Sequence, residues 1–175
     1  KVRYCERCFN VAESQLRRDV SQLDTYVELL KADAQELGSL NDDLLIGVTR
    51  FFRDSDGYDR LLTRAIRPML SGKSPDDEYR VWVAGCATGQ EAYSVAMLVY
   101  DEKQRTQSEF RVKIFATDVH PEAIRFAQRG VYPYESIMEI PLHLREKYIQ
   151  KSGSQFEICK EVRDTIVFAR HDLTQ

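Results

Sequence analysis

The alternation of apolar and polar residues predicts a strand, a tight turn and a helix in the middle of the chain. β-Forming residues fill 79–83, and a turn containing Gly85 and Gly89 leads to residues 91–100, which are good helix formers without Gly or Pro. Small turn residues let a ligand approach the unpaired N–H groups at the start of such a helix. The turn lacks the Lys of a phosphate loop and the full GxGxxG spacing, so by itself it fits an ordinary tight corner as well as a ligand site.

The same strand-then-helix pattern recurs downstream. Residues 112–117 form an apolar run that ends at Asp118, and a helix is expected between the proline and the glycine of 121–130. Further strands that would extend the sheet are expected at 155–159 and 165–169. This order favours an α/β fold with a parallel sheet, in which Gly85 and Asp118 should face one crevice.

Acidic residues dominate the predicted crevice. Glu91 follows the turn where a phosphate loop would carry a cation, so the group bound nearby should be positively charged. Asp118 ends the second strand, where a carboxylate can accept hydrogen bonds from two ribose hydroxyls. As an alternative, Asp118 only caps the following helix. His171 lies next to the crevice, and we assign it no catalytic role.

The chain divides into two predicted parts. Residues 1–73 should form a small all-α domain with a connecting helix, and residues 74–175 an α/β domain. Apolar residues recur every three or four positions between Leu16 and Leu30, as on one face of a helix. Basic residues outnumber acidic ones before Asp19, which fits a solvated face or a docking face for an acidic partner.

Composition narrows the function classes. A net charge of −3 gives no electrostatic case for binding nucleic acid, and no apolar run is long enough for insertion into a membrane. Without a signal peptide, and with four cysteines that suit a reducing compartment, the chain is expected to be cytoplasmic. No second cysteine or histidine pair completes a zinc site with Cys5 and Cys8, so we expect no metal.

Four stretches, taken together, resemble the CheR family of chemotaxis receptor methyltransferases. They are LLIGVTRFFRD at 44–54, RVWVAGCATGQEAYS at 80–94, FATDVHPEAIRFAQRGVY at 115–132 and VFARHDL at 167–173. The resemblance implies a Rossmann-like sheet that binds S-adenosyl-L-methionine (SAM), preceded by a helical domain that docks on receptors. It also implies transfer of the SAM methyl group to glutamate side chains of chemoreceptor cytoplasmic helices, with S-adenosyl-L-homocysteine as the product.

By this resemblance, a set of residues would bind the cofactor: Thr49, Arg53, Gly85, Glu91, Asp118, Asp172 and Leu173. Thr49 and Arg53 would flank its reacting end, and Glu91 would hold its ammonium group. Arg53 is the catalytic candidate, orienting either the accepting carboxylate or the carboxylate of the cofactor. The neighbouring Phe51 and Phe52 are expected to keep water from the nucleophile.

The remaining assignments concern the nucleoside. Asp118 would hold the ribose, and Asp172 with Leu173 would contact the adenine. The family usually has Asn where this chain has Gly47 and Asp172, Glu in place of Gln90, and Pro in place of Ala92.

The chain ends soon after its last expected strand, so it has fewer strands than a complete methyltransferase sheet. We therefore expect a truncated form that keeps part of the cofactor site and has little turnover by itself. A second hypothesis is a non-catalytic module that binds SAM or its product as a sensor or scaffold. A third, a nicotinamide-dependent oxidoreductase, shares the strand and the acid but lacks the GxGxxG turn.

Overall fold

The computed structural model describes residues 23–44, 49–71, 74–107 and 109–173. They fall into two compact units, 1–46 and 47–175. The predicted helix that starts at Leu16 lies partly outside the described residues. Cys5 and Cys8 both lie outside them. Within the described ranges, no helix is both long and apolar enough to cross a membrane.

The described part of the first unit, residues 23–44, forms the short helices α2 (Leu23–Ala32) and α3 (Ala34–Leu44). Asp33 separates them, and its carboxylate accepts hydrogen bonds from the N–H groups of Gln35 and Glu36 at 2.9 and 3.2 Å, as an N-terminal helix cap does. Tyr26 is buried, and its hydroxyl donates to Glu36 Oε1 at 3.1 Å, which ties α2 to α3.

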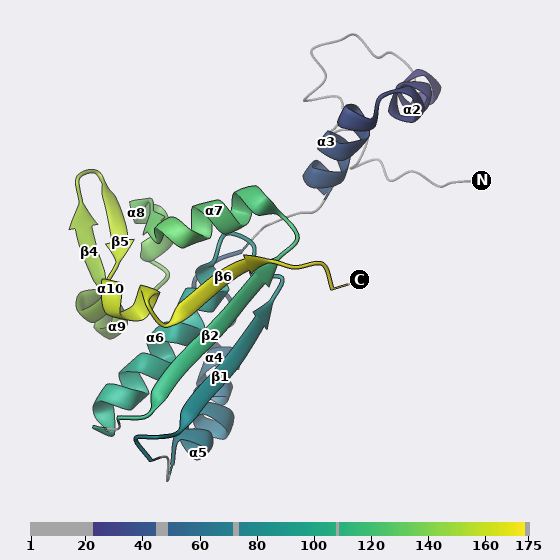
Figure 1. Ribbon diagram of the computed structural model, residues 1–175. Coiled ribbons are helices and arrows are strands. Elements are labelled where there is room, and N and C mark those ends of the chain that lie inside the picture. Colours follow the sequence, from purple (N-terminus) through teal and green to yellow (C-terminus); the bar gives the residue numbers. More distant parts are fainter. Residues whose placement is uncertain (1–22, 45–48, 72–73, 108, 174–175) are drawn as a thin grey trace. The chain divides into compact units, whose positions relative to one another are not determined.

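The second unit is built on a parallel sheet, as predicted. Its described strands are β1 (Glu78–Ala84), β2 (Arg111–Asp118) and β6 (Ile166–Arg170), paired in the order β1-β2-β6 (Figure 1). In register, Val81 pairs with Ile114 and Ile114 with Ile166, so one face carries a continuous apolar row.

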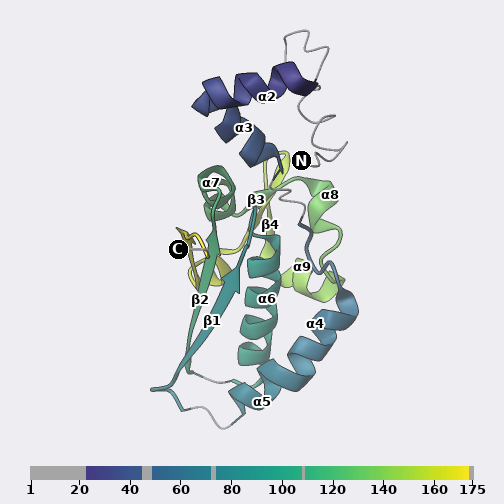
Figure 2. The same ribbon diagram turned by 90° about the vertical axis from the view of Figure 1, so that its right-hand side faces the viewer.

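One long helix covers that face of the sheet. α6 (Gln90–Arg105) lies against the strands, α4 (Ser55–Leu61) lies on the far side of α6, and α5 (Arg67–Leu70) lies near the C-terminal end of α6 (Figure 2). Residues 92–99 of α6 are all buried. A π-helical turn, Leu62–Ile66, joins α4 to α5.

The border between the two units differs from the predicted one. We expected it between residues 73 and 74, whereas one unit comprises residues 1–46 and the other residues 47–175. The physical reason is packing, because Ile66 and Leu70 are buried in the same hydrophobic core as the strands and α6. The connecting helix therefore belongs with the sheet.

A second, antiparallel sheet stands beside the first. β3 (Val131–Tyr132), β4 (Ile149–Ser152) and β5 (Gln155–Ile158) pair in the order β3-β5-β4. The strand predicted at 155–159 exists but does not extend the parallel sheet, because Gly153, with φ of +62°, turns the chain back into a hairpin with β4. The surrounding helices are α7 (Pro121–Arg129), α8 (Tyr134–Ile137), α9 (Leu142–Tyr148) and α10 (Lys160–Arg163).

Candidate functional site

The turn between β1 and α6 contains three residues in the left-handed region. Gly85, Ala87 and Gly89 have φ of +70°, +45° and +94°. A Cβ atom on Gly89 would lie 2.8 Å from Cβ of Ala127 and 3.0 Å from the hydroxyl oxygen of Tyr132, whereas one on Gly85 would meet nothing within 4 Å. Gly89 thus lets the turn pack closely on its neighbours, and Gly85 leaves the backbone open to a ligand.

Asp118 is tied directly to this turn. Its Oδ2 accepts a hydrogen bond from the N–H of Ala87 at 2.8 Å, and its Oδ1 accepts one from the N–H of His120 at 2.9 Å. The predicted proximity of the glycine turn and the acid is confirmed. The alternative that Asp118 only caps the following helix is wrong, because the N-cap of α7 is His120, which has no side-chain cap, and Asp118 bonds the N–H of His120 from outside the helix. Each carboxylate oxygen can accept a further bond, so these backbone bonds and ligand binding are compatible.

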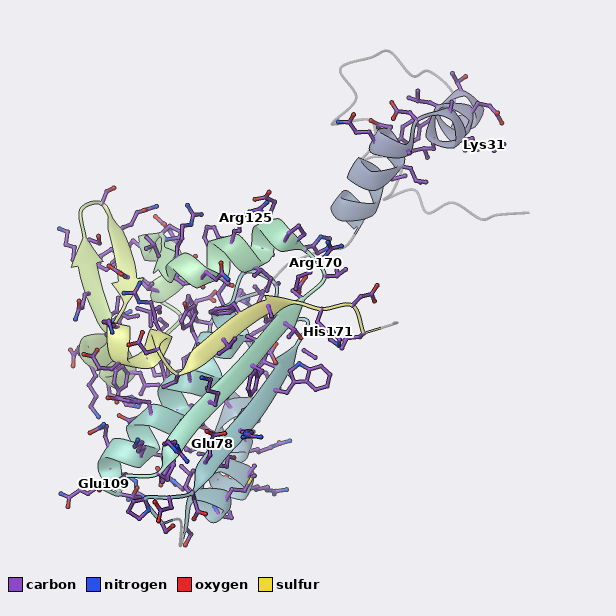
Figure 3. All side chains as sticks on the ribbon, viewed as in Figure 1. Lys31, Glu78, Glu109, Arg125, Arg170 and His171 are labelled. Carbon is purple, nitrogen blue, oxygen red and sulfur yellow. The ribbon has the colours of Figure 1, made fainter. Side chains whose placement is uncertain are left out.

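The end of β6 reaches the same edge. The N–H of His171 donates to the carbonyl of Asp118 at 3.0 Å, which carries Asp172 and Leu173 past the ends of the strands. Figure 3 shows His171 at this edge and Glu78 at the opposite edge, where β1 begins. The Trp82 ring lies 6.0 Å from that of His171, and its Nε1–H donates to Thr117 Oγ1 at 3.0 Å.

Arg53 and Glu91 share a cavity of about 450 Å³ between α4 and the first turns of α6. The other lining residues are Asp54, Gly57, Tyr58, Leu61 and Val95. Burial, together with the negative charge of Glu91, raises the pKa of Tyr58 to about 12. A side-chain hydrogen bond between Tyr58 and Ser94 lowers the pKa and partly offsets this rise.

Thr49 lies elsewhere, in a second cavity of about 220 Å³. This cavity is also lined by Arg50, Gln90, Glu135, Ser136 and Glu139. Arg50 forms an ion pair of 3.3 Å with Glu139, which lies two residues after the end of α8. Because Gln90 and Glu91 are consecutive, the two cavities flank the same end of α6.

The two phenylalanines do not line either cavity. Phe51 is 1% exposed and packs edge-on against Tyr132, with ring centroids 4.9 Å apart. Phe52 is 8% exposed and packs against Tyr58 at 5.0 Å. They fix the segment that carries Arg53 to the core, and their effect on the solvation of a nucleophile stays a prediction.

Comparison with known proteins assigns most of the chain to a family. A family model described as the SAM-binding domain of CheR methyltransferase matches residues 47–175. The chain belongs to the CheR methyltransferase family. The matched model indicates SAM as the cofactor.

Several curated CheR relatives match over most of this chain. A protein of Rhodobacter capsulatus, named as an uncharacterized 104.1 kDa protein in the hypE 3′ region, is 43% identical over 156 residues, which is 89% of this chain and 16% of that protein. The chemotaxis protein methyltransferase of Borreliella burgdorferi is 32% identical over 142 residues, covering 79% of this chain and 50% of that protein. That of Escherichia coli is 29% identical over 143 residues, covering 81% and 47%. The chain thus spans about half the length of the named methyltransferases.

The residues implied by the CheR resemblance fall into three neighbouring places. The carboxyl ends of the strands, or the residues just after them, hold Gly85, Asp118, Asp172 and Leu173. The larger cavity is lined by Arg53 and Glu91, and the smaller one by Thr49. Their individual roles stay predictions.

Sequence reasoning missed two residues of this region. Tyr58 was not singled out, because an aromatic residue in the first turns of a helix most often serves only the core. Ser94, fully buried in α6, gave no signal beyond its position inside the YRVWVAGCATGQEAYS stretch.

Proposed function

We propose that this chain binds SAM at the edge where β1, β2 and β6 end, and that it transfers the methyl group to glutamate side chains of chemoreceptors. The hydrogen bond from Ala87 N–H to the Asp118 carboxylate carries the proposal, because it brings the open glycine turn and the acid into one site. The names of the relatives, chemotaxis protein methyltransferase, support the reaction and its substrate class.

The side chains present fit this cofactor. Gly85 leaves space beside the backbone, and Asp118 retains acceptor capacity for ribose hydroxyls. Glu91, exposed in the first turn of α6, can pair with an ammonium group. When bound, SAM supplies a methyl group on a positively charged sulfur.

The reaction needs alignment more than proton transfer. A glutamate side chain with an ordinary pKa of about 4.3 is ionised at pH 7, so no general base is required. With SAM bound, transfer of its methyl group to a carboxylate oxygen would need no proton transfer by this chain. Arg53, on the rim of the larger cavity, can orient the accepting carboxylate through paired N–H donors.

Calorimetric titration with S-adenosyl-L-homocysteine tests the binding half of the proposal. Asp118→Ala should weaken binding at least about tenfold, or about 1.4 kcal/mol. Since Asp118 also holds Ala87, a 3′-deoxy analogue of the ligand separates the two effects. The missing hydroxyl should weaken binding to the wild type and make little difference to the variant. Equal losses in both would remove Asp118 from ribose binding.

Transfer is tested with the complete gene product and tritiated SAM. Receptor cytoplasmic fragments should accept label, and matched fragments with Gln in place of the accepting Glu should not. Binding of S-adenosyl-L-homocysteine without any incorporation would favour the non-catalytic sensor or scaffold instead. Competition by NAD would revive the oxidoreductase alternative.

A further inference from the structure

The Ser94 hydroxyl connects two segments that are far apart in sequence. It donates to the carbonyl of Gln90 at 2.8 Å within α6, and its oxygen accepts the N–H of Phe52 at 3.1 Å, a bond that spans 42 positions. Ser94 is 0% exposed. A serine inside a helix often bonds its own preceding turn, but the second bond reaches a different part of the fold.

Phe52 is the residue whose backbone most needs this support. Its φ of +49° lies in the left-handed region, which a residue with a Cβ rarely adopts. Its side chain is buried, and its N–H would lose a hydrogen bond inside the core if the Ser94 oxygen were absent. The bond therefore sets the direction in which the chain leaves Phe52, and the next residue is Arg53.

The chain is also fixed on the other side of Arg53. Asp54 caps α4, with its Oδ1 accepting the N–H of Gly57 at 3.1 Å. A Cβ atom on Gly57 would lie 2.6 Å from Asp54 Oδ2, so the cap is closely fitted. Arg53 thus stands between two anchored residues, and its side chain reaches the cavity that it shares with Glu91.

We propose that Ser94 is a positioning residue that holds Arg53 at the first turns of α6. Ser94 lies one helical turn after Glu91 on α6, so the hydroxyl fixes Arg53 relative to the helix that presents Glu91. This inference rests on the proposed function, because it takes Arg53 as a contact of the cofactor or of the accepting carboxylate. Ser94 itself touches neither.

Two substitutions of equal shape test the hydroxyl. Ser94→Thr keeps it and Ser94→Val lacks it, while both add similar bulk. Calorimetry with S-adenosyl-L-homocysteine should show that the Val variant binds at least about fivefold more weakly than the Thr variant. In an Arg53→Ala background the same pair should differ by less than about twofold, because the residue being positioned is gone.

The outcomes separate the possibilities. An equal Val-to-Thr difference in both backgrounds would show a general structural role and overturn the inference. Unchanged affinity of Arg53→Ala by itself would remove Arg53 from the site and overturn it too, while leaving the cofactor proposal intact. Should both bulky variants fail to fold, Ser94→Ala against wild type in the same two backgrounds gives the same comparison.

A measurement without ligand covers failure of the proposed function. If neither the wild type nor any variant binds S-adenosyl-L-homocysteine, the hydrogen-exchange rate of the Phe52 amide still tests whether Ser94 holds this segment. Exchange at least about tenfold faster in the Val variant than in the Thr variant would support positioning. Equal exchange rates would overturn it.

Discussion

Asp118 shows how one side chain in this protein serves structure and, by our proposal, binding. Its two oxygens accept backbone N–H groups from the turn before α6 and from the start of α7. A carboxylate in this position satisfies backbone N–H donors of two chain segments at once. The side chain is consequently held in one orientation before any ligand arrives, which lowers the entropy cost of binding.

At Gly89 we predict a large loss of stability on substitution. Gly89→Ala should lower the free energy of unfolding by about 2–4 kcal/mol, because backbone strain adds to a clash with Ala127 and Tyr132. Chemical denaturation measures this. Gly153→Ala is the matched control, since its φ is also positive but a Cβ there meets nothing within 4 Å, and it should cost about 1–2 kcal/mol. Similar losses at both positions would contradict the packing role of Gly89.

At the level of single residues, the sequence allowed the pairing of Asp118 with the glycine turn to be predicted, because strand ends of a parallel sheet meet at one edge. The contacts of Ser94 and Tyr58 could not be predicted. They depend on how the segment before α4 folds back on α6, and nothing in local pattern specifies a hydrogen bond across 42 positions.

α6 is the element to which most of the second unit is attached. Its first turn lies beside both cavities, its middle is buried against the sheet, and its last turns bind α5 through charge. Glu102, only 4% exposed, accepts hydrogen bonds from Arg105 and from Arg67 of α5. The hydrogen bond from Arg105, with further help from Arg67, lowers the pKa of Glu102 below its ordinary value of 4.5.

This pair of bonds predicts a pH-dependent stability. A carboxylate with a lowered pKa stabilises the fold above its unfolded value, and this contribution disappears as pH falls through the folded value. Glu102→Gln should therefore cost about 1–3 kcal/mol at pH 7, with the difference from wild type shrinking below about pH 4.5. Urea unfolding between pH 3 and pH 7 measures it.

The control is a surface pair of the same chemistry. Glu122, exposed and paired with Arg125 on α7, should tolerate Glu122→Gln at every pH without a measurable change. A constant penalty for Glu102→Gln across the whole pH range would contradict the ionic origin of its effect.

Among the elements, strands with a strong apolar run and helices bounded by Pro and Gly were predicted well, as β1, β2 and α7 show. α6 runs on to Arg105, five residues past its expected end, because buried Glu102 is satisfied by charged partners. The separate sheet of β3, β4 and β5 was not predicted, since an apolar run does not reveal which strand it will pair with.

On the scale of the whole molecule, burial is uneven between the two compact units. Among the described residues of 23–44, Tyr26 is the buried hydrophobic residue, whereas the second unit has an extensive core that includes Phe110, Ile114 and Tyr132. Local stability generally follows such differences in buried apolar contact.

Amide hydrogen exchange should accordingly distinguish the two units. Amides of α6 and β2 should be protected far more strongly than those of α2 and α3, because opening the second unit exposes a larger core. Mass spectrometry of peptides after exchange measures the difference under native conditions. Identical protection in the two units would mean that they unfold as one cooperative body.

Trp82 gives the molecule a built-in optical reporter. It is the single tryptophan of the chain. Its indole N–H is hydrogen-bonded to Thr117, next to Asp118, and its ring lies near that of His171, next to Asp172, at a tilt of 56°. An adenosine moiety held by these two acids would change the surroundings of the indole, so its fluorescence should shift or quench on titration. Trp82→Phe should abolish this signal, while calorimetry still detects binding. The fluorescence of the wild type would then report ligand binding in real time without any label.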